Sequence, residues 1–344
     1  MFRIARGCEV CEKGAKLVLF VTGICDLDCF YCPVSEKRRG KDIAWANERP
    51  IVNEEDLIIE AERMRALGAG VTGGEPLLRL ERCCRFISIL KEHFGEDFHI
   101  HLYTAKAPSL ESIKKLKKAG LDEIRYHILA EKQWKSIEKA VSLGLDVGIE
   151  IPVFPNEEGR ILGMAERLGR VGGTFINLNE LEFSDTNAER MLKRGYIPKS
   201  EYSYGVKGSE ETAKKAIAIA EERGILLHYC SSSYKDSVQL RKRLLRTAKN
   251  IAKPYEEVTE EGLLFKGIIE IEHPTLQRLK EVKRYLVKRY GVPNGLVEVD
   301  VEKMRIETSP EIASFFSDKI SYRCFLVEEY PTYDRLEVER IPLP

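Results

Sequence analysis

Cys25-Asp26-Leu27-Asp28-Cys29-Phe30-Tyr31-Cys32 is the stretch that decides the fold, because it places three thiols in a C-x3-C-x2-C spacing directly after the β-rich segment 16–23. Three thiolates on one short loop can hold three corners of a cubane iron–sulfur cluster and leave the fourth iron open for a substrate. Structural metal sites normally have four protein ligands. The loop therefore predicts a reactive metal centre at the end of a strand.

The composition of the chain fits this prediction. The 344 residues, 43% of them hydrophobic, can build one large domain or two. No run of 18 apolar residues exists, and residues 1–6 lack the apolar stretch of a signal peptide, so we expect a soluble, cytoplasmic protein with no membrane partner. The nine cysteines are clustered and odd in number, which favours metal or thiolate chemistry over a disulfide framework. Lys+Arg and Asp+Glu are equal at 55 each, so global charge predicts no polyanionic partner.

Short β-branched runs alternate with helical patterns from residue 16 onward, which is typical of βα units around a parallel sheet. We expect strands near 16–22, 69–72, 98–104, 123–128, 146–153, 174–182 and 225–230. This number of units predicts an α/β fold with a partial (β/α)6-type barrel over residues 16–253, rather than a closed eightfold barrel. Residues 1–15 form an N-terminal arm, and residues 254–344 read as a small separate α+β domain with β-like runs at 267–271, 296–307, 321–328 and 335–341.

The expected strands are polar on one face. In the run 99–103 the odd positions carry His99, His101 and Tyr103, and the other expected strands alternate in the same way. Side chains alternate across a strand, so one face packs on helices and the other is hydrophilic. A sheet of βα units is covered by helices on its outside, and buried polar groups need partners. We therefore expect a polar, ligand-filled lumen, with an exposed sheet face as the alternative.

Two motifs together resemble the radical S-adenosylmethionine (SAM) superfamily. The first is the cysteine loop with an aromatic residue before its last cysteine, and the second is the string 71–78, Val-Thr-Gly-Gly-Glu-Pro-Leu-Leu, after the second expected strand. The resemblance covers roughly residues 16–230. The block 16–49, together with stretches at 99–103, 177–182 and 235–241, is similar to an uncharacterised archaeal group related to pyruvate formate-lyase activating enzymes.

The resemblance implies a cofactor and a mechanism. Cys25, Cys29 and Cys32 would bind a [4Fe-4S] cluster whose open iron chelates SAM, and SAM cleavage would give a 5′-deoxyadenosyl radical that abstracts hydrogen. It also implies an oxygen-sensitive enzyme and an electron donor such as ferredoxin or flavodoxin. The residues that would contact SAM are Gly73 and Gly74 through their backbone, Glu75 through the SAM ammonium group, Tyr31 near the adenine, and Thr104, Glu150, Asn177 or Asn179 near the ribose or carboxylate.

A second metal site is a further hypothesis. Cys8 and Cys11 form a C-x2-C followed by Gly14, a pattern found in metal knuckles. Their best partners are His228 and Cys230, at the end of the last expected barrel strand. The set could hold an auxiliary iron–sulfur cluster or a zinc ion, with free thiols as the alternative.

Three functions remain open on the sequence alone. Basic residues follow the cysteine loop at 37–41, and the segment 184–208 carries Tyr196, Tyr202 and Tyr204 as a candidate lid or binding loop. These features and the extra domain favour modification of a macromolecule, with RNA slightly ahead of protein. The second hypothesis is a glycyl-radical activating enzyme acting on a partner protein, and the third is a non-catalytic metal-binding protein on the same scaffold.

Overall fold

The computed structural model describes residues 3–344 and divides into two compact units. The first unit comprises the chain up to Glu62 together with Ala66–Leu240, and the second comprises Arg63–Arg65 and Arg241–Pro344. This division differs from the expected boundary at 253/254, because helix α10 (Arg241–Ile251) goes with the second unit. Within the described part of the chain, no helix combines the length and apolar character needed to cross a membrane.

A nine-stranded sheet in the order β3-β2-β1-β4-β5-β6-β7-β8-β9 forms the centre of the first unit. Seven of its strands are parallel: β1 (Lys16–Phe20), β4 (Gly68–Thr72), β5 (His99–Thr104), β6 (Glu123–Tyr126), β7 (Asp146–Val153), β8 (Phe175–Glu180) and β9 (His228–Cys230). They lie where the sequence predicts seven strands, which confirms the α/β partial barrel. The sheet is open, because β9 ends the strand order without pairing to the other edge.

A short hairpin extends the sheet at its first edge. Strands β2 (Trp45–Ala46) and β3 (Arg49–Pro50) pair antiparallel, and β2 pairs with β1. Two-residue strands show no alternation of polar and apolar residues, so the sequence pattern does not reveal them.

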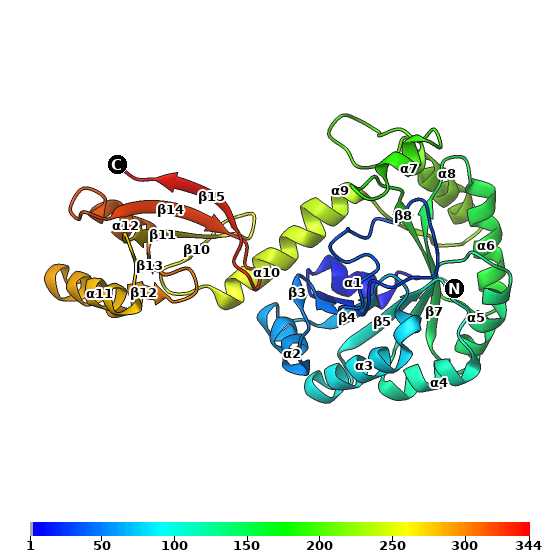
Figure 1. Ribbon diagram of the computed structural model, residues 1–344. Helices are drawn as coiled ribbons and strands as arrows, with labels where there is room; N and C mark the ends of the chain where they lie inside the picture. Colours follow the sequence, from blue (N-terminus) through cyan, green and yellow to red (C-terminus); the bar gives the residue numbers. More distant parts are fainter. Residues whose placement is uncertain (1–2) are drawn as a thin grey trace. The chain divides into compact units, whose positions relative to one another are not determined.

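The helices of the first unit connect its strands, and Figure 1 shows α3 to α6 following the outside of the curved sheet. Apolar strand residues such as Leu19, Ile100 and Ile149 are buried. Ser109 caps α4 by accepting a hydrogen bond from the Ser112 N–H (3.1 Å), as a helix N-cap does. The helical segments of this unit are α1 (Arg6–Glu12), α2 (Glu54–Arg63), η1 (Pro76–Arg79), α3 (Leu80–Phe94), α4 (Leu110–Ala119), α5 (Lys132–Ser142), α6 (Glu158–Arg170), α7 (Ala188–Leu192), α8 (Ser209–Glu222), α9 (Ser232–Tyr234) and η2 (Lys235–Leu240).

Helix α1 packs against β1, β4 and β5 (Figure 1). Gly7 lets it approach the inward face of the sheet, because a Cβ there would lie 2.4 Å from His101 Nδ1 and 2.5 Å from Arg125 Nη2. The Gly7 N–H donates to Glu123 Oε2 (3.3 Å). Residues expected to form an N-terminal arm therefore include a helix that covers part of the polar face of the barrel.

The second unit is an antiparallel sheet with helices, in agreement with the expected α+β domain. Its elements are α10, β10 (Glu257–Val258), β11 (Leu264–Glu270), α11 (Leu276–Tyr290), η3 (Asn294–Leu296), β12 (Val297–Asp300), β13 (Arg305–Thr308), α12 (Pro310–Phe316), β14 (Arg323–Glu329) and β15 (Glu337–Pro342). The main strand order is β12-β13-β11-β14-β15, and β10 pairs with β11. The run 296–307 is therefore two strands and a turn rather than one strand. Ile269, Leu279, Leu286, Ile306 and Phe316 belong to its apolar core.

Candidate active site

The three loop cysteines follow β1 and open onto one cavity. Cys25, Cys29 and Cys32 are free thiols, and all three line a cavity of about 910 Å³ inside the barrel. Cys25 is exposed and Cys29 and Cys32 are half-buried. Burial raises the pKa of the Cys25 thiol, while the Leu27 N–H, 3.4 Å from its sulfur, lowers it. A bound iron would favour the thiolate form, so this donor set fits a metal that takes thiolate ligands.

The segment after β8 braces the cysteine loop. Asn187 Nδ2 donates to the Tyr31 carbonyl (3.0 Å), and Thr186 Oγ1 donates to the Cys32 carbonyl (3.3 Å). Arg190, on α7, donates to both carboxylate oxygens of Asp28 at 2.7 and 2.9 Å. Part of the expected lid at 184–208 thus holds the cysteines in place.

The glycines of the 71–78 string are needed for contact with the cysteine loop. A Cβ on Gly73 would lie 2.6 Å from the Thr22 carbonyl oxygen, and a Cβ on Gly74 would lie 2.6 Å from that of Ile24. The Gly74 N–H donates to the Thr22 carbonyl (2.7 Å), and the Glu75 N–H donates to the Ile24 carbonyl (2.9 Å). The two motifs are therefore joined backbone to backbone.

Glu75 is 1% exposed and caps η1. Its Oε1 accepts from the Leu77 N–H (3.0 Å) and the Thr104 hydroxyl (2.8 Å), and its Oε2 accepts from the Ala105 N–H (2.9 Å). Burial raises the pKa of Glu75, and these three donors oppose that shift. Glu75 and Thr104, both predicted to contact SAM, thus contact each other at the cavity wall, where Oε2 keeps capacity for one further donor.

Tyr31 joins the cysteine loop to β6. Its hydroxyl lies 2.8 Å from His127 Nε2. Burial lowers the pKa of His127 to about 4 and raises the pKa of Tyr31, so the hydrogen bond joins a neutral imidazole and a neutral phenol at pH 7. Tyr196 stacks on Phe30 with ring centroids 5.8 Å apart. Tyr196 is therefore engaged within the protein, whereas Tyr202 and Tyr204 are exposed.

A network of charged and amide side chains occupies the inward face of β6, β7 and β8. Arg125 Nη1 donates to Glu150 Oε2 (2.6 Å), Asn177 Nδ2 donates to the same oxygen (3.0 Å), and Asn179 Nδ2 donates to Glu150 Oε1 (3.0 Å). Burial raises the pKa of Glu150, but Arg125 and the two amides outweigh it, and the net shift is downward. The expected polar lumen is confirmed: Glu150 and Asn179 line the cavity, while Asn177 is not among its lining residues.

The four residues of the expected second metal site are Cys8, Cys11, His228 and Cys230, and two of them accept hydrogen bonds from amide side chains. Cys8 and Cys11 lie on helix α1, so the expected knuckle turn is wrong. Cys8 Sγ accepts from Asn177 Nδ2 (3.1 Å), and Cys230 Sγ accepts from Gln239 Nε2 (3.5 Å). Among the described residues, the ligand atoms of Cys8, Cys11, His228 and Cys230 do not come within 4.8 Å of one another as a group of three or more, so the structure does not assemble a zinc site from them. The iron–sulfur alternative for this set stays a prediction.

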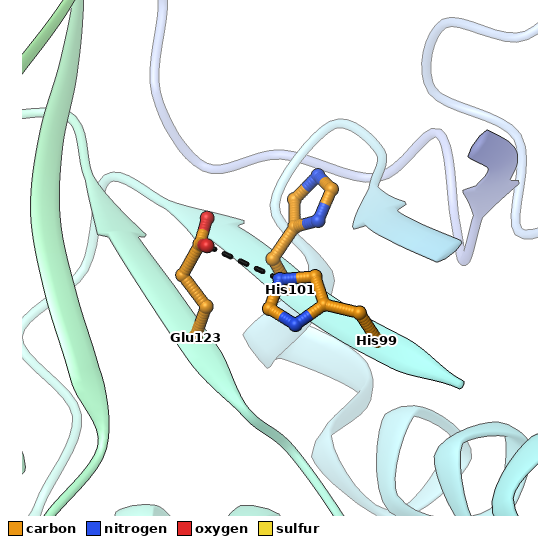
Figure 2. A group of neighbouring side chains, drawn as sticks. All are labelled: His99, His101 and Glu123. Atoms are coloured by element: carbon orange, nitrogen blue, oxygen red, sulfur yellow. Dashed lines mark hydrogen bonds and ion pairs between the residues drawn. The ribbon is translucent and has the colours of Figure 1, made fainter. Parts of the chain in front are cut away.

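His99, His101 and Glu123 do form a compact group, with ligand atoms within 4.8 Å of one another (Figure 2). Figure 2 shows the contact between His99 Nε2 and Glu123 Oε2, at 3.1 Å. Glu123 also accepts from Arg125 Nε, and Arg125 lowers the pKa of Glu123 to about 2 against the effect of burial. Because the guanidinium already neutralises this carboxylate, the group is better explained as the polar anchor of α1 than as a cation site.

Sequence reasoning placed Arg125 and His127 on the polar face without assigning them a role, and it did not single out Lys16. All three line the cavity. Lys16 has the same parity along β1 as Val18, which also lines the cavity, so alternation could have identified it.

The comparisons with known proteins agree with the geometry of the loop and the barrel. Residues 19–130 match the family model described as "Radical SAM superfamily", and residues 262–343 match "Domain of unknown function (DUF8061)". A relative from Methanocaldococcus jannaschii, named "Putative glycyl-radical enzyme activating enzyme", is 42% identical and covers 99% of this chain and 93% of its own. "Probable GTP 3′,8-cyclase" of Aeropyrum pernix is 27% identical over 44% of this chain and 48% of its own.

A solved structure with a similar fold is SuiB of Streptococcus suis bound to S-adenosylmethionine, with a TM-score of 0.45 and 11% identity over 63% of this chain and 50% of that chain. The relative from M. jannaschii extends over both units, so the kinship is not confined to the two motifs. This chain belongs to the radical SAM superfamily, in the group related to the glycyl-radical enzyme activating enzymes.

Proposed function

We propose that this protein cleaves SAM reductively at a [4Fe-4S] cluster held by Cys25, Cys29 and Cys32, and abstracts hydrogen from a substrate bound in the barrel lumen. The observation that carries the proposal is that three free thiols and the Gly73-Gly74-Glu75 turn open onto one cavity of about 910 Å³. When bound, the cluster and SAM supply the electron transfer and the carbon radical.

The residues of this chain would bind and orient SAM and the substrate, and they would exclude water from the site. Glu75 is held by three donors, and its remaining acceptor capacity on Oε2 suits an ammonium group. Tyr31 is fixed by His127 and offers an aromatic face to the cavity. Glu150 is kept ionised by Arg125 and the two asparagines, so it can accept hydrogen bonds from hydroxyl groups. Neither an electron carrier nor a structural protein needs such a chamber.

For the substrate, activation of a partner protein now has better support than RNA modification. The name of the 42% identical relative points to a protein substrate. In addition, two of the basic residues after the cysteine loop are occupied: Arg38 donates to the Asn47 carbonyl (2.7 Å), and the Lys37 ammonium lies 4.8 Å from the centre of the Trp45 ring. RNA stays the second candidate through the exposed tyrosines and Arg39 at the cavity.

The test is 5′-deoxyadenosine formation by anaerobically reconstituted protein, with a low-potential reductant and a native cell extract. Cys32→Ala should abolish the product, and Cys84→Ala, which removes a half-buried thiol of α3, should leave it unchanged. Protease treatment of the extract should remove the stimulation, and RNase should not. Product formation independent of Cys32 would overturn the proposal, and sensitivity to RNase alone would replace the protein substrate with RNA.

A further inference from the structure

Lys16 is a cation inside the barrel without an ion-pair partner. It begins β1, lines the cavity, and passes beside Gly70, where a Cβ would lie 3.4 Å from Lys16 Cδ. Among the described residues, none forms a hydrogen bond or an ion pair with its ammonium group. Lys16 is half-buried, and an ammonium group that is partly removed from water without a direct counter-ion is costly.

The carboxylates that line the same cavity are already engaged. Glu150 binds Arg125, Glu180 binds Lys199 (3.0 Å), Glu182 binds Lys235 (3.2 Å), and Asp28 binds Arg190. Glu75 is held by its three donors. The other cations of the cavity wall, Arg39, Arg125 and Lys235, each have an ion pair. Lys16 alone among the described cavity-lining cations lacks one.

The ammonium group stays charged in this position. Burial lowers the pKa of Lys16, but Tyr103, Cys11 and Glu150 raise it, and the net shift is upward. Glu150 attracts Lys16 but is bound directly by Arg125 and makes no ion pair with Lys16, so the ammonium group keeps its hydrogen-bonding capacity for an anion from outside the chain.

Lys16 also lies far from the cysteine loop along the strand. Lys16 and Thr22 are six residues apart, which corresponds to roughly 20 Å at the rise of a β-strand. The Lys16 side chain covers only part of this distance. The carboxylate of SAM, which belongs at the cysteine loop, is thus not the anion that Lys16 would meet.

We propose that Lys16 forms a carboxylate-binding subsite at the deep end of the lumen, which anchors the substrate while its reacting C–H bond lies nearer the cysteine loop. A single unpaired cation matches a single negative charge. A phosphate monoester carries about −1.5 to −2 at pH 7 and would bury excess charge beside Glu150. The carboxylate belongs either to a small acid or to a side chain or terminus of a protein substrate. The inference rests on the lumen being the chamber of the proposed reaction.

The binding test uses reconstituted protein saturated with SAM and no reductant, so it does not depend on turnover. Butyrate is titrated by calorimetry at constant ionic strength, with inorganic phosphate as the second probe. We expect saturable butyrate binding that is at least tenfold weaker in Lys16→Met, retained in Lys16→Arg, and unchanged in Lys118→Met, which alters an exposed lysine of α4. Preference for phosphate, competition between butyrate and SAM, or equal binding by Lys16→Met would overturn the subsite.

The stability of Lys16→Met gives an independent readout. If the ammonium is unpaired until the substrate binds, its removal should raise Tm without butyrate and abolish the further rise that butyrate causes. A lower Tm would instead mean that Lys16 is a structural residue, and it would refute the inference.

The two sources of the carboxylate are separated by ultrafiltration of the extract in the 5′-deoxyadenosine assay. Activity in the small-molecule filtrate identifies a free acid, and activity in the retentate identifies a protein. In both cases Lys16→Met should lose the stimulated turnover and keep the slow cleavage without substrate. Failure of the proposed function would appear as Cys32-independent product, whereas failure of the subsite leaves Cys32-dependent product intact in Lys16→Met.

Discussion

The Tyr31 hydroxyl and His127 Nε2 lie 2.8 Å apart and join the cysteine loop to the residue that follows β6, the fourth parallel strand of the barrel. This contact couples the part of the chain that would hold the cluster to the lumen wall. Because both side chains are half-buried, the hydrogen bond is partly shielded from competing water. Loss of this hydrogen bond should therefore disturb the position of the cysteine loop more than the fold of the first unit.

Tyr31→Phe should therefore reduce the stability of the first unit by about 1 kcal/mol, the usual net contribution of one hydrogen bond. The ring packing on Phe30 and Phe154 is kept in this variant, so the iron content should stay near that of the parent. SAM affinity, measured by equilibrium binding, should fall several-fold because the ring is less well fixed. Tyr202→Phe, at a fully exposed position, is the control, and equal effects of both changes would contradict the role of the contact.

His127 should make stability depend on pH. Its pKa is lowered by burial from 6.5 to about 4, so the unfolded chain binds this proton before the folded chain does. The stabilisation is complete above pH 6.5 and is lost as pH falls toward 4. In denaturant titrations of the apo protein, His127→Gln should show a smaller loss of unfolding free energy across this window. An unchanged slope in the variant would show that His127 titrates normally.

Gly74→Ala tests the backbone contact between the two motifs. The new Cβ would lie 2.6 Å from the Ile24 carbonyl oxygen, so the cysteine loop would have to move. We expect a loss of about 1–3 kcal/mol, as for other overpacked sites, and a lower iron content after reconstitution. Gly163→Ala is the matched control, because a Cβ on this glycine of α6 meets no atom within 4 Å. Normal iron content in Gly74→Ala would refute the role of this contact.

The sequence predicted those features that depend on local pattern. The cysteine spacing, the Gly-Gly-Glu string and the alternation in the barrel strands led directly to the loop, the turn and the polar lumen. It could not show that Glu150 faces Arg125, because that pairing depends on the register between β6 and β7. The prediction of a metal knuckle at Cys8 and Cys11 was wrong, because a C-x2-C spacing also fits one turn of a helix. The close packing of Gly7 on His101, which favours the helix, depends on the tertiary structure and is not visible in the sequence.

The second unit depends on a buried lysine, which gives the last prediction. Lys266 is 1% exposed, and its ammonium lies 3.3 Å from Glu256, 2.5 Å from Glu307 and 2.8 Å from Glu329. Burial raises the pKa of Glu307, but Lys266 and Arg305 lower it to about 2, so Glu307 is ionised at neutral pH. Lys266→Met fills the space but leaves three carboxylates short of one positive charge, which should cost about 3–5 kcal/mol.

Lys280→Met, at an exposed position of α11, should change stability by less than about 0.5 kcal/mol. Part of the loss in Lys266→Met should be recovered at lower pH as the carboxylates take up protons, and a loss that is equal at pH 7 and pH 5 would show that packing, not charge, is the function of Lys266.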